Sequence, residues 1–323
     1  MRSLYSGVAG LRTHQTKMDV VGNNIANVNT YGYKSQRATF RDMYYQTIRS
    51  SSTGVNATQL GYGAQVGSID VLHNQAGYAP TDRPMDVYID GEGFITVSDP
   101  NGGEMFTRIG ALSFMPDGKT GTFNLVDMNG NPVMGLSGTT TRRFGHIDET
   151  TGNFVPGNAN AKPGDADYSK DDVWMMDPAA VNLDKNHADY GTIDGALAPV
   201  TIDNFKDFNN VSIGANGVIT GIDKEGKVHQ LGLIPVAKIS NPEGLTMQGS
   251  SYYKAINNTG DIEYDVAGSN GVGGLIPGAL EMSNVDLAKE FTDMITTQRG
   301  YQANSRIISV VDEMLQELVN LKR

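Results

Sequence analysis

The sequence lacks cysteine, has a single tryptophan and contains no long uninterrupted apolar run. Without cysteine, the chain can form neither disulfide bridges nor thiolate metal sites. No apolar run approaches the roughly 18 residues that a membrane-spanning helix needs, so we expect no membrane insertion. Polar residues between Arg12 and Lys17 interrupt the place where a signal peptide would carry its apolar core. We therefore expect any export to proceed without a cleaved hydrophobic leader.

Positive charge is scarce over the whole chain. The 323 residues include 25 Lys and Arg against 36 Asp and Glu, a formal net charge of −11. An acidic chain of this kind argues against nucleic acid as the main partner. The first 50 residues are an exception, because they hold seven basic residues and only Asp19 and Asp42 as acidic ones. The segment from Glu281 onward is slightly acidic, so charge favours contact between the two chain ends, modestly and in a salt-dependent way.

Motifs for catalysis and ligand binding are also scarce. The five histidines form no pair at metal-ligand spacing, and no Ser-His-Asp order or G-x-S-x-G motif is present. The turn Asp90–Gly93 has two glycines but no helix after it, so it lacks the context of a nucleotide-binding loop. We predict no catalytic residue, no cofactor and no metal.

Apolar residues recur at every seventh position near both ends of the chain. A row with this period stays on one face of a helix only if the helix winds slowly around a partner. We therefore predict coiled-coil-like helices over 1–30 and 278–323 that pack together. Ser283 and Asp286 form a capping-box pattern at the start of the second helix. The two rows are Leu4, Leu11, Met18 and Ile25, and Leu287, Met294, Tyr301, Ile308 and Leu315, with Phe291 beside the second.

Ordinary amphipathic helices on a single domain are the alternative for these rows. The interleaved positions are half polar, as at Gln15 and Ser305, which leaves a narrow apolar seam. A narrow seam is typical of helix association, whereas a core-facing helix shows a wide apolar face.

Short alternating runs and glycine-rich turns fill the middle of the chain. They predict a discontinuous central β domain, mainly antiparallel, over 78–136 and 199–277. Within it, Met85–Ile89 and Phe94–Val97 flank a short turn and predict a hairpin. Residues 31–77 are polar with patchy periodicity, but their aromatic residues argue against a flexible linker. We predict an extended arm that lies between subunits, and the overall class is α+β.

Residues 137–198 differ from the rest of the middle and predict an inserted outer subdomain. They carry ten acidic and five basic residues, few apolar ones and Trp174. Lys170 stands where a calcium loop needs glycine and Met176 where it needs a closing glutamate, so a solvated acidic loop is the simpler interpretation. The calcium-loop pattern itself consists of Asp165, Asp167, Ser169 and Asp171.

Several stretches resemble the signatures of bacterial flagellar rod and hook proteins. Leu4–Leu11, Met18–Thr30 and Tyr31–Lys34 are similar to the N-terminal signature of that family, and Gly278–Leu287 and Gln298–Ser305 to its C-terminal one. Asp86–Phe94 and Thr107–Gly110 resemble its central β domain. The family-motif positions are Asn23, Asn24, Asn27, Gly32, Ser283, Asn284, Gln298 and Arg299.

The resemblance implies a structural subunit of the flagellum and no enzyme. Its copies would leave the cell through the flagellar type III export apparatus and stack into a hollow helical polymer. The heptad rows would then mediate self-assembly. The resemblance also implies adjoining rod, hook-cap and hook–filament junction proteins, and a location in the extracellular hook or the basal body.

Within the family, the C-terminal stretch and the insert at 137–198 favour a hook subunit that works as a flexible joint. The segment from Gln36 to Arg49 is similar both to distal rod proteins and to the shorter hook proteins of Gram-positive bacteria, so a stiff distal rod subunit is the alternative. A peptidoglycan hydrolase is the enzymatic alternative, although no catalytic constellation supports it. An adhesin centred on 137–198 would expose an aromatic patch around Trp174.

Overall fold

The computed structural model describes residues 2–51, 53–54, 56–99, 102–117, 122–137, 142–147, 154–156, 173–176, 193, 197–202 and 205–321. The chain divides into two compact units. Unit 1 combines residues 1–74 with 283–323, and unit 2 is residues 75–282. A helix lies at each end of the chain, and all strand pairs of the described residues are antiparallel. The predicted α+β class, with terminal helices packed together and a central antiparallel β domain, is confirmed.

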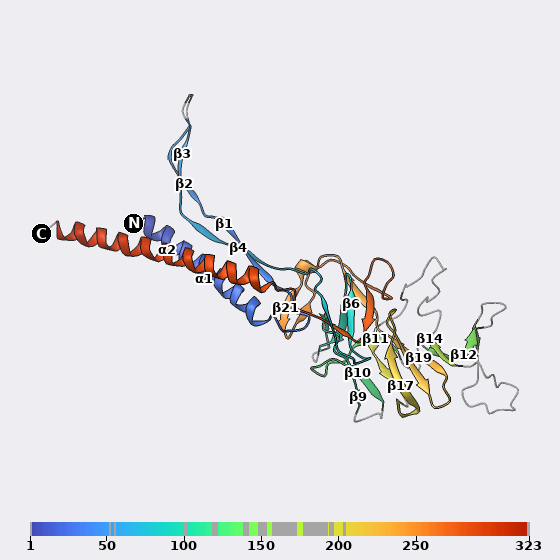
Figure 1. Cartoon of the computed structure of the whole chain (residues 1–323). Coiled ribbons are helices and arrows are strands. Elements are labelled where there is room, and N and C mark those ends of the chain that lie inside the picture. The colour runs from blue at the N-terminus through green and yellow to red at the C-terminus, as the bar shows by residue number, and fades with distance from the viewer. Residues whose placement is uncertain are drawn as a thin grey trace, which may run out of the picture. The chain divides into compact units, whose positions relative to one another are not determined.

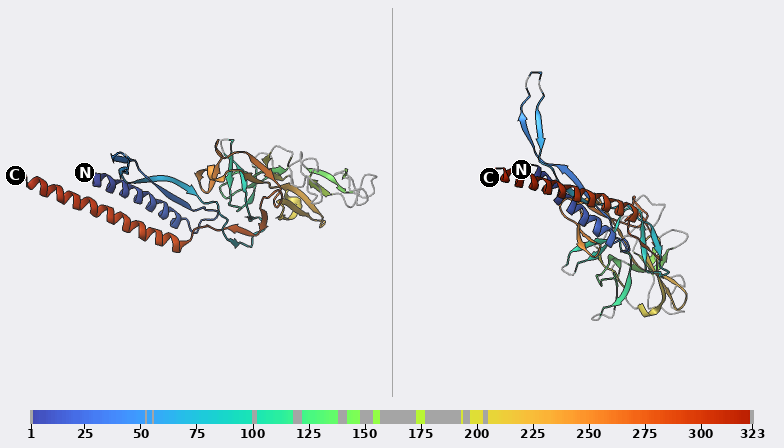
Figure 2. Two further views of the ribbon diagram at one scale, coloured as in Figure 1. Left: turned by 90° about the horizontal axis from the view of Figure 1, so that it is seen from above. Right: turned by 60° about the vertical axis from the view of Figure 1, so that its left-hand side comes forward.

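Unit 1 is built on two helices, α1 (Arg2–Ala26) and α2 (Leu287–Asn320). They lie side by side, and α2 continues past the N-terminal end of α1 (Figures 1 and 2). In the part of the chain that the structure describes, neither helix is long and apolar enough to cross a membrane.

The start of α2 differs from its prediction. The N-cap is Asp286, whose carboxylate accepts hydrogen bonds from the backbone N–H groups of Ala288 and Lys289. Ser283 was predicted as the cap, but its hydroxyl accepts only from the N–H of Val285, before the helix begins. Either residue type can cap a helix, and here Asp286 is the one next to the first free N–H groups.

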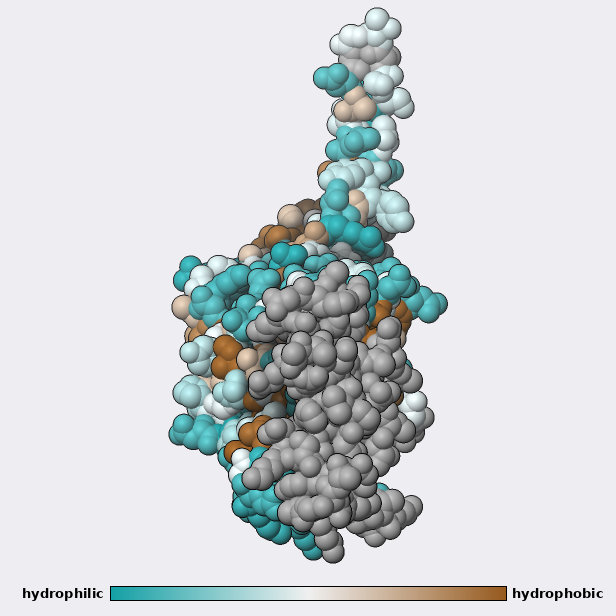
Figure 3. All heavy atoms as spheres, turned by 90° about the vertical axis from the view of Figure 1, so that its right-hand side faces the viewer, coloured by the Kyte–Doolittle hydropathy of each residue, from teal (hydrophilic) through white to brown (hydrophobic). Residues whose placement is uncertain are grey.

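Between the helices, unit 1 contains two antiparallel ribbons of two strands each. β1 (Gln36–Asp42) pairs with β4 (Ala64–Val71), and β2 (Tyr45–Arg49) pairs with β3 (Thr58–Gly61). The chain predicted to be an extended arm, 31–77, therefore doubles back on itself over most of its length (Figure 1). The outer ribbon, at the top of Figure 3, shows mostly hydrophilic residues.

Unit 2 consists of short strands in several sheets. The largest has six strands in the order β21-β22-β8-β7-β20-β23, and a second has five in the order β15-β11-β19-β18-β17. The strands are β5 (Tyr78–Pro80), β6 (Val87–Asp90), β7 (Phe94–Ser98), β8 (Glu104–Thr107), β9 (Ser113–Pro116), β10 (Phe123–Val126), β11 (Met134–Ser137), β12 (Arg142–Ile147), β13 (Phe154–Pro156), β14 (Val173–Met176), β15 (Ala198–Pro199), β16 (Thr201–Ile202), β17 (Phe208–Ile213), β18 (Val218–Asp223), β19 (Val228–Leu233), β20 (Val236–Ile239), β21 (Thr246–Gly249), β22 (Tyr252–Lys254), β23 (Ile262–Asp265), β24 (Gly274–Pro277) and β25 (Ala279–Glu281), with 3-10 turns η1 (Phe205–Asp207) and η2 (Pro242–Gly244).

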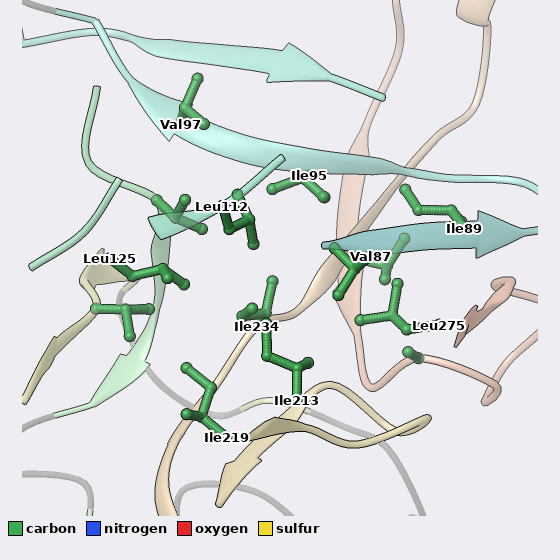
Figure 4. Packing of buried hydrophobic residues seen from close by; sticks show 14 of the residues in the cluster. Val87, Ile89, Ile95, Val97, Leu112, Leu125, Ile213, Ile219, Ile234 and Leu275 are labelled. Carbon is green, nitrogen blue, oxygen red and sulfur yellow. The ribbon is translucent and has the colours of Figure 1, made fainter. Parts of the chain in front are cut away.

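One apolar core joins these sheets. Aliphatic side chains from segments that are far apart in sequence gather in one cluster, where Figure 4 shows Val87 beside Leu275 and Ile213 beside Ile234. All four are almost completely buried. Because the contacts join residues from both predicted halves, 78–136 and 199–277, these halves fold into one body.

The predicted hairpin between Met85–Ile89 and Phe94–Val97 is wrong. β6 pairs with β24, whereas β7 pairs with β8 and β20. The turn residues Gly91 and Gly93 have φ angles of +133° and +129°, outside the range of ordinary hairpin loops. The chain therefore leaves one sheet at Asp90 and enters another at Phe94, so both strands can bury both of their faces.

The predicted outer subdomain, 137–198, lies largely outside the described residues. Within it, β12 pairs with β13 and with β14 to form a separate small sheet. The calcium-loop positions Asp165, Asp167, Ser169 and Asp171 and the side chain of Trp174 lie outside the described residues.

Candidate self-assembly site

The terminal helices approach each other through glycines. A Cβ added at Gly7 would lie 3.3 Å from Ile308 Cγ1. From the other side, a Cβ at Gly300 would lie 2.7 Å from His14 Cε1, and Gly10 is equally crowded by α2. The sequence position rises along α1 as it falls along α2, so the helices run antiparallel. The absence of a side chain at these positions allows the close backbone approach.

The contact face of α2 is mostly polar. Glu290 and Thr297 are buried there, and Val311 is the buried apolar residue toward the far end. Lys17 Nζ lies 3.1 Å from Asp293 Oδ1 in a partly exposed ion pair between the helices. Such a pair adds little to stability because water screens it, so it contributes mainly to the alignment of the helices.

The predicted heptad rows lie beside this contact face. The N-terminal row is half-buried throughout, as are Met294 and Ile308. A strict seven-residue row drifts by about 20° per heptad around a straight α-helix, so it cannot follow one straight contact. Apolar surface consequently stays open on α2, at Leu287 (39% exposed), Phe291 (50%), Tyr301 (38%) and Leu315 (37%).

Asn24 ties the end of α1 to the first strand. Its side chain is 1% exposed. Its Nδ2 donates to the carbonyl oxygen of Gln36 at 2.8 Å, and its Oδ1 accepts from the N–H of Gln36 at 3.0 Å. The same oxygen accepts from the hydroxyl of Tyr33 at 3.1 Å. An amide can bracket a backbone in this way because it offers both donor and acceptor.

Asn284 does the same for the segment before α2. Its Oδ1 accepts from the N–H of Ser35 at 2.7 Å, and its Nδ2 donates to the carbonyl oxygen of Leu72 at 2.8 Å. It therefore joins the chain on both sides of the β1–β4 ribbon to the start of α2. Two asparagines 260 positions apart thus hold the helices and the arm in one arrangement.

The remaining N-terminal motif residues close α1. Asn27 Nδ2 donates to the backbone oxygen of Asn23 at 2.9 Å, and the hydroxyl of Thr30 donates to Asn27 Oδ1. Gly32 follows at φ +65°, a left-handed conformation that glycine adopts without strain. These contacts explain why the helix ends where the strand must begin.

The remaining C-terminal motif residues do not join this network. Ser283 is half-buried before the helix, and Gln298 and Arg299 are exposed on α2. Exposed polar residues next to an apolar row are suited to contacts with another molecule.

Burial perturbs two titratable groups between the helices. It raises the pKa of the Glu290 carboxyl above its ordinary 4.5, and Asp293 adds to this, while Asn24 and the lysines Lys289 and Lys17 oppose it. Burial next to α2 lowers the pKa of His14, and Lys17 contributes in the same direction.

The replacement Glu290→Gln is expected to stabilise unit 1 at neutral pH. The pKa of the Glu290 carboxyl is higher in the folded state than in the unfolded state, so the folded state binds the proton more tightly. The free energy of unfolding therefore falls as the pH rises from the unfolded-state pKa through the folded-state pKa. The variant should lose this acid-range dependence and gain about 1 kcal/mol at neutral pH. Thermal unfolding of the dilute chain from acid to neutral pH, followed by far-ultraviolet circular dichroism, measures both the pH dependence and the gain in stability. Asp19→Asn, at an exposed position of α1, is the matched control, and equal pH profiles would refute the assignment.

Sequence reasoning missed the contact glycines and the role of the motif asparagines. Gly7 and Gly10 stand three residues apart in a helix, and this small-residue spacing was the available signal. The hydrogen bonds of Asn24 and Asn284 depend on the fold of the arm, so only the three-dimensional structure reveals them.

Comparison with protein families gives three matches along the chain. Residues 4–34 match the model "Flagella basal body rod protein", residues 88–221 match "Flagellar hook protein FlgE/F/G D1 domain", and residues 276–321 match "Flagellar basal body rod FlgEFG protein C-terminal".

Individual relatives span the whole chain. The flagellar basal-body rod protein FlgG of Bacillus subtilis is 37% identical over 330 positions, with 100% of both chains covered. The flagellar hook protein FlgE of Borreliella burgdorferi is 32% identical over 447 positions, again with 100% of both covered. The flagellar hook protein FlgE of Salmonella typhimurium is 28% identical over 414 positions, with 99% of this chain and 100% of the relative covered.

Proposed function

This chain belongs to the flagellar rod and hook protein family, and we propose that it is a structural subunit of the flagellar hook. Proteins of this family are structural parts of the flagellum and are not enzymes. In the proposal, copies of the chain form a hollow helical tube that transmits motor torque as a flexible joint. Rod, hook-cap and hook–filament junction proteins adjoin the tube.

The separate sheet of β12, β13 and β14 is the observation that leads us to propose a hook subunit instead of a rod subunit. It stands as an insert between β11 and β15, in addition to the strands that build the core. The two hook relatives named above align with nearly the whole chain, and because their alignments run to 447 and 414 positions against 323 residues here, they also carry material that this chain lacks. Outer segments that slide past one another suit a tube that bends.

A distal rod subunit is the second candidate. The rod protein of Bacillus subtilis aligns over 330 positions, close to the length of this chain, and at higher identity than the hook relatives named above. A rod works as a stiff drive shaft, so the two candidates differ in mechanics and in position along the flagellum.

Exposed apolar surface on the terminal helices supports assembly of either kind. On α2, the side chains of Phe291 and Tyr301 are exposed in the single chain. A contact that repeats head to tail without closing produces a filament. In the proposal, the arm bridges neighbouring subunits, and the subunits reach the growing tip through the flagellar type III export apparatus.

Placing a charge in the apolar rows is expected to abolish polymerisation. Leu11→Glu or Met294→Glu would bury an unpaired carboxylate between subunits, which is strongly unfavourable. Sedimentation and electron microscopy should show no polymer, while the circular dichroism of the chain should still contain the strand signal of unit 2. Gln15→Glu, at an exposed polar position of α1, should still polymerise. Normal tubes from Leu11→Glu and Met294→Glu would refute the role of these rows.

Deletion of the gene distinguishes the hook candidate from the distal rod candidate. In the hook proposal, electron microscopy of basal bodies should show a finished rod that carries no hook. An unfinished rod would instead support the distal rod candidate. Complete flagella in the deletion strain would contradict both.

A further inference from the structure

A hollow lies in unit 1 where α1 meets the joint between the two ribbons. Its volume is about 520 Å³, and its lining includes Tyr5, Val8, Arg12, Met43, Tyr44 and Tyr62. Tyr5 is 71% exposed and Tyr44 is 84% exposed. Large aromatic side chains that gather at one exposed site with a single cationic group indicate a contact surface.

The hollow has a defined backbone frame. The ribbons join through hydrogen bonds from Met43 N to the Gly63 oxygen (2.8 Å) and from Tyr62 N to the Tyr44 oxygen (3.1 Å). A Cβ at Gly63 would lie 3.3 Å from the Cβ of Ala9, so this joint rests directly on α1. The aromatic side chains are therefore carried by a fixed scaffold at the base of the arm.

A complementary surface lies at the end of α2. Val310, Met314, Leu318 and Leu321 are exposed by 51%, 53%, 62% and 81% and follow the three- and four-residue spacing of one helix face. With Glu313 and Glu317 they line a second shallow hollow of about 520 Å³. This stripe, which we call the α2 tail, is apolar with acidic flanks.

The tail cannot reach the hollow of its own chain. α2 contacts α1 on the face of Gly7, Gly10 and His14, whereas Val8 and Arg12 are exposed beside the ribbon joint. The helix is continuous to Asn320 and runs on past the start of α1 (Figure 2). A second copy of the chain must therefore supply any tail that fills the hollow.

We propose that the α2 tail of one copy docks in the hollow of a second copy, with Glu313 and Glu317 facing Arg12. This inference rests on the proposed function, because it names the surfaces through which the subunits join. The apolar stripe covers the tyrosines and Val8, and the acidic flanks complement the cation. The two surfaces differ, so each docked copy leaves one free tail and one free hollow, and the contact propagates.

Because the chain has no cysteine, crosslinking can test the contact directly. Cells that express a mixture of Val8→Cys and Leu318→Cys copies should yield flagella in which mild oxidation joins the two variants into dimers. A disulfide requires Cα atoms within about 7 Å, so it reports direct proximity. Copies with Gln302→Cys, exposed elsewhere on α2, mixed with Leu318→Cys copies are the matched control and should remain uncrosslinked.

Charge reversal tests the ionic part of the contact. Arg12→Glu should weaken polymerisation about tenfold in critical concentration, which corresponds to roughly 1.4 kcal/mol. Adding Glu313→Arg and Glu317→Arg to the same chain should restore it, because the charges then match again. A rescue of this kind requires that the residues meet, so a mere folding defect at Arg12 would not produce it.

The outcomes separate this inference from the proposed function. Flagella that form normally without a Val8–Leu318 crosslink, or a charge reversal without rescue, would overturn the docking while the hook proposal stands. A protein that is absent from isolated hooks and rods would overturn the proposed function itself.

Discussion

Replacing Asn24 with alanine is expected to lower the free energy of unfolding of unit 1 by about 3 kcal/mol. The change removes three hydrogen bonds, two to the backbone of Gln36 and one to the hydroxyl of Tyr33, from a site that is 1% exposed. Burial excludes water that could replace them, so the Tyr33 hydroxyl loses an acceptor at a desolvated position. The expected loss is large relative to the total stability of a small unit.

Urea denaturation of the dilute full chain, followed by far-ultraviolet circular dichroism, measures this loss, because α1 and α2 supply the helical signal. Asn27→Ala is the matched control, since its hydrogen bonds to Asn23 lie at an exposed position. It should cost less than about 1 kcal/mol. Equal losses in the two variants would show that Asn24 has no special role.

The asparagine variant also separates folding from assembly. Asn24 lies at the junction of α1 with β1, so its loss should loosen the arm relative to the helices before any contact between copies is involved. Polymerisation of Asn24→Ala should therefore recover at low temperature or with added stabilising osmolyte. Recovery is not expected for Leu11→Glu, where the defect lies in the contact itself.

Local sequence patterns predicted the positions of helices and strands more reliably than they predicted which of these elements pair or pack together. Alternation located the strands around Val87 and Ile95, because each needs only its own neighbours to be recognised. The pairing of these strands was mispredicted, since it depends on Gly274–Pro277, nearly two hundred residues away. A hairpin is the default for adjacent strands, and the positive φ angles of Gly91 and Gly93 that exclude it here leave no distinct mark in the sequence.

The helices show the same limit in another form. The seven-residue rows located α1 and α2, but the contact between them is formed by glycines, Asn304 and buried Glu290. Apolar periodicity identifies surface that must be covered, and it cannot say whether the same chain or another copy covers it. The motif asparagines were identified as family positions, while their hydrogen bonds required the three-dimensional arrangement of four segments.

Replacing Arg108 with methionine is expected to destabilise unit 2 by about 3–5 kcal/mol. Arg108 Nη1 lies 3.5 Å from Glu281 Oε1, and the two side chains are 3% and 0% exposed. The guanidinium also donates to the carbonyl oxygens of Gly91 and Gly93. It thus fixes the turn that directs the chain from β6 to β7. Methionine fills a similar volume but leaves the Glu281 carboxylate buried without its cation, which is the costly part of the change.

A double replacement distinguishes the lost charge from the lost packing. Arg108→Met with Glu281→Met removes both charges and should recover a substantial part of the loss, because an apolar pair of similar volume can occupy a buried ion-pair site. Lys224→Met is the exposed control, since its partner Asp207 is 61% exposed, and it should change stability by less than about 1 kcal/mol. Urea denaturation followed by near-ultraviolet circular dichroism reports on the aromatic residues of unit 2. If the double variant is no more stable than Arg108→Met, the hydrogen bonds to Gly91 and Gly93, and not the ion pair, dominate the role of Arg108.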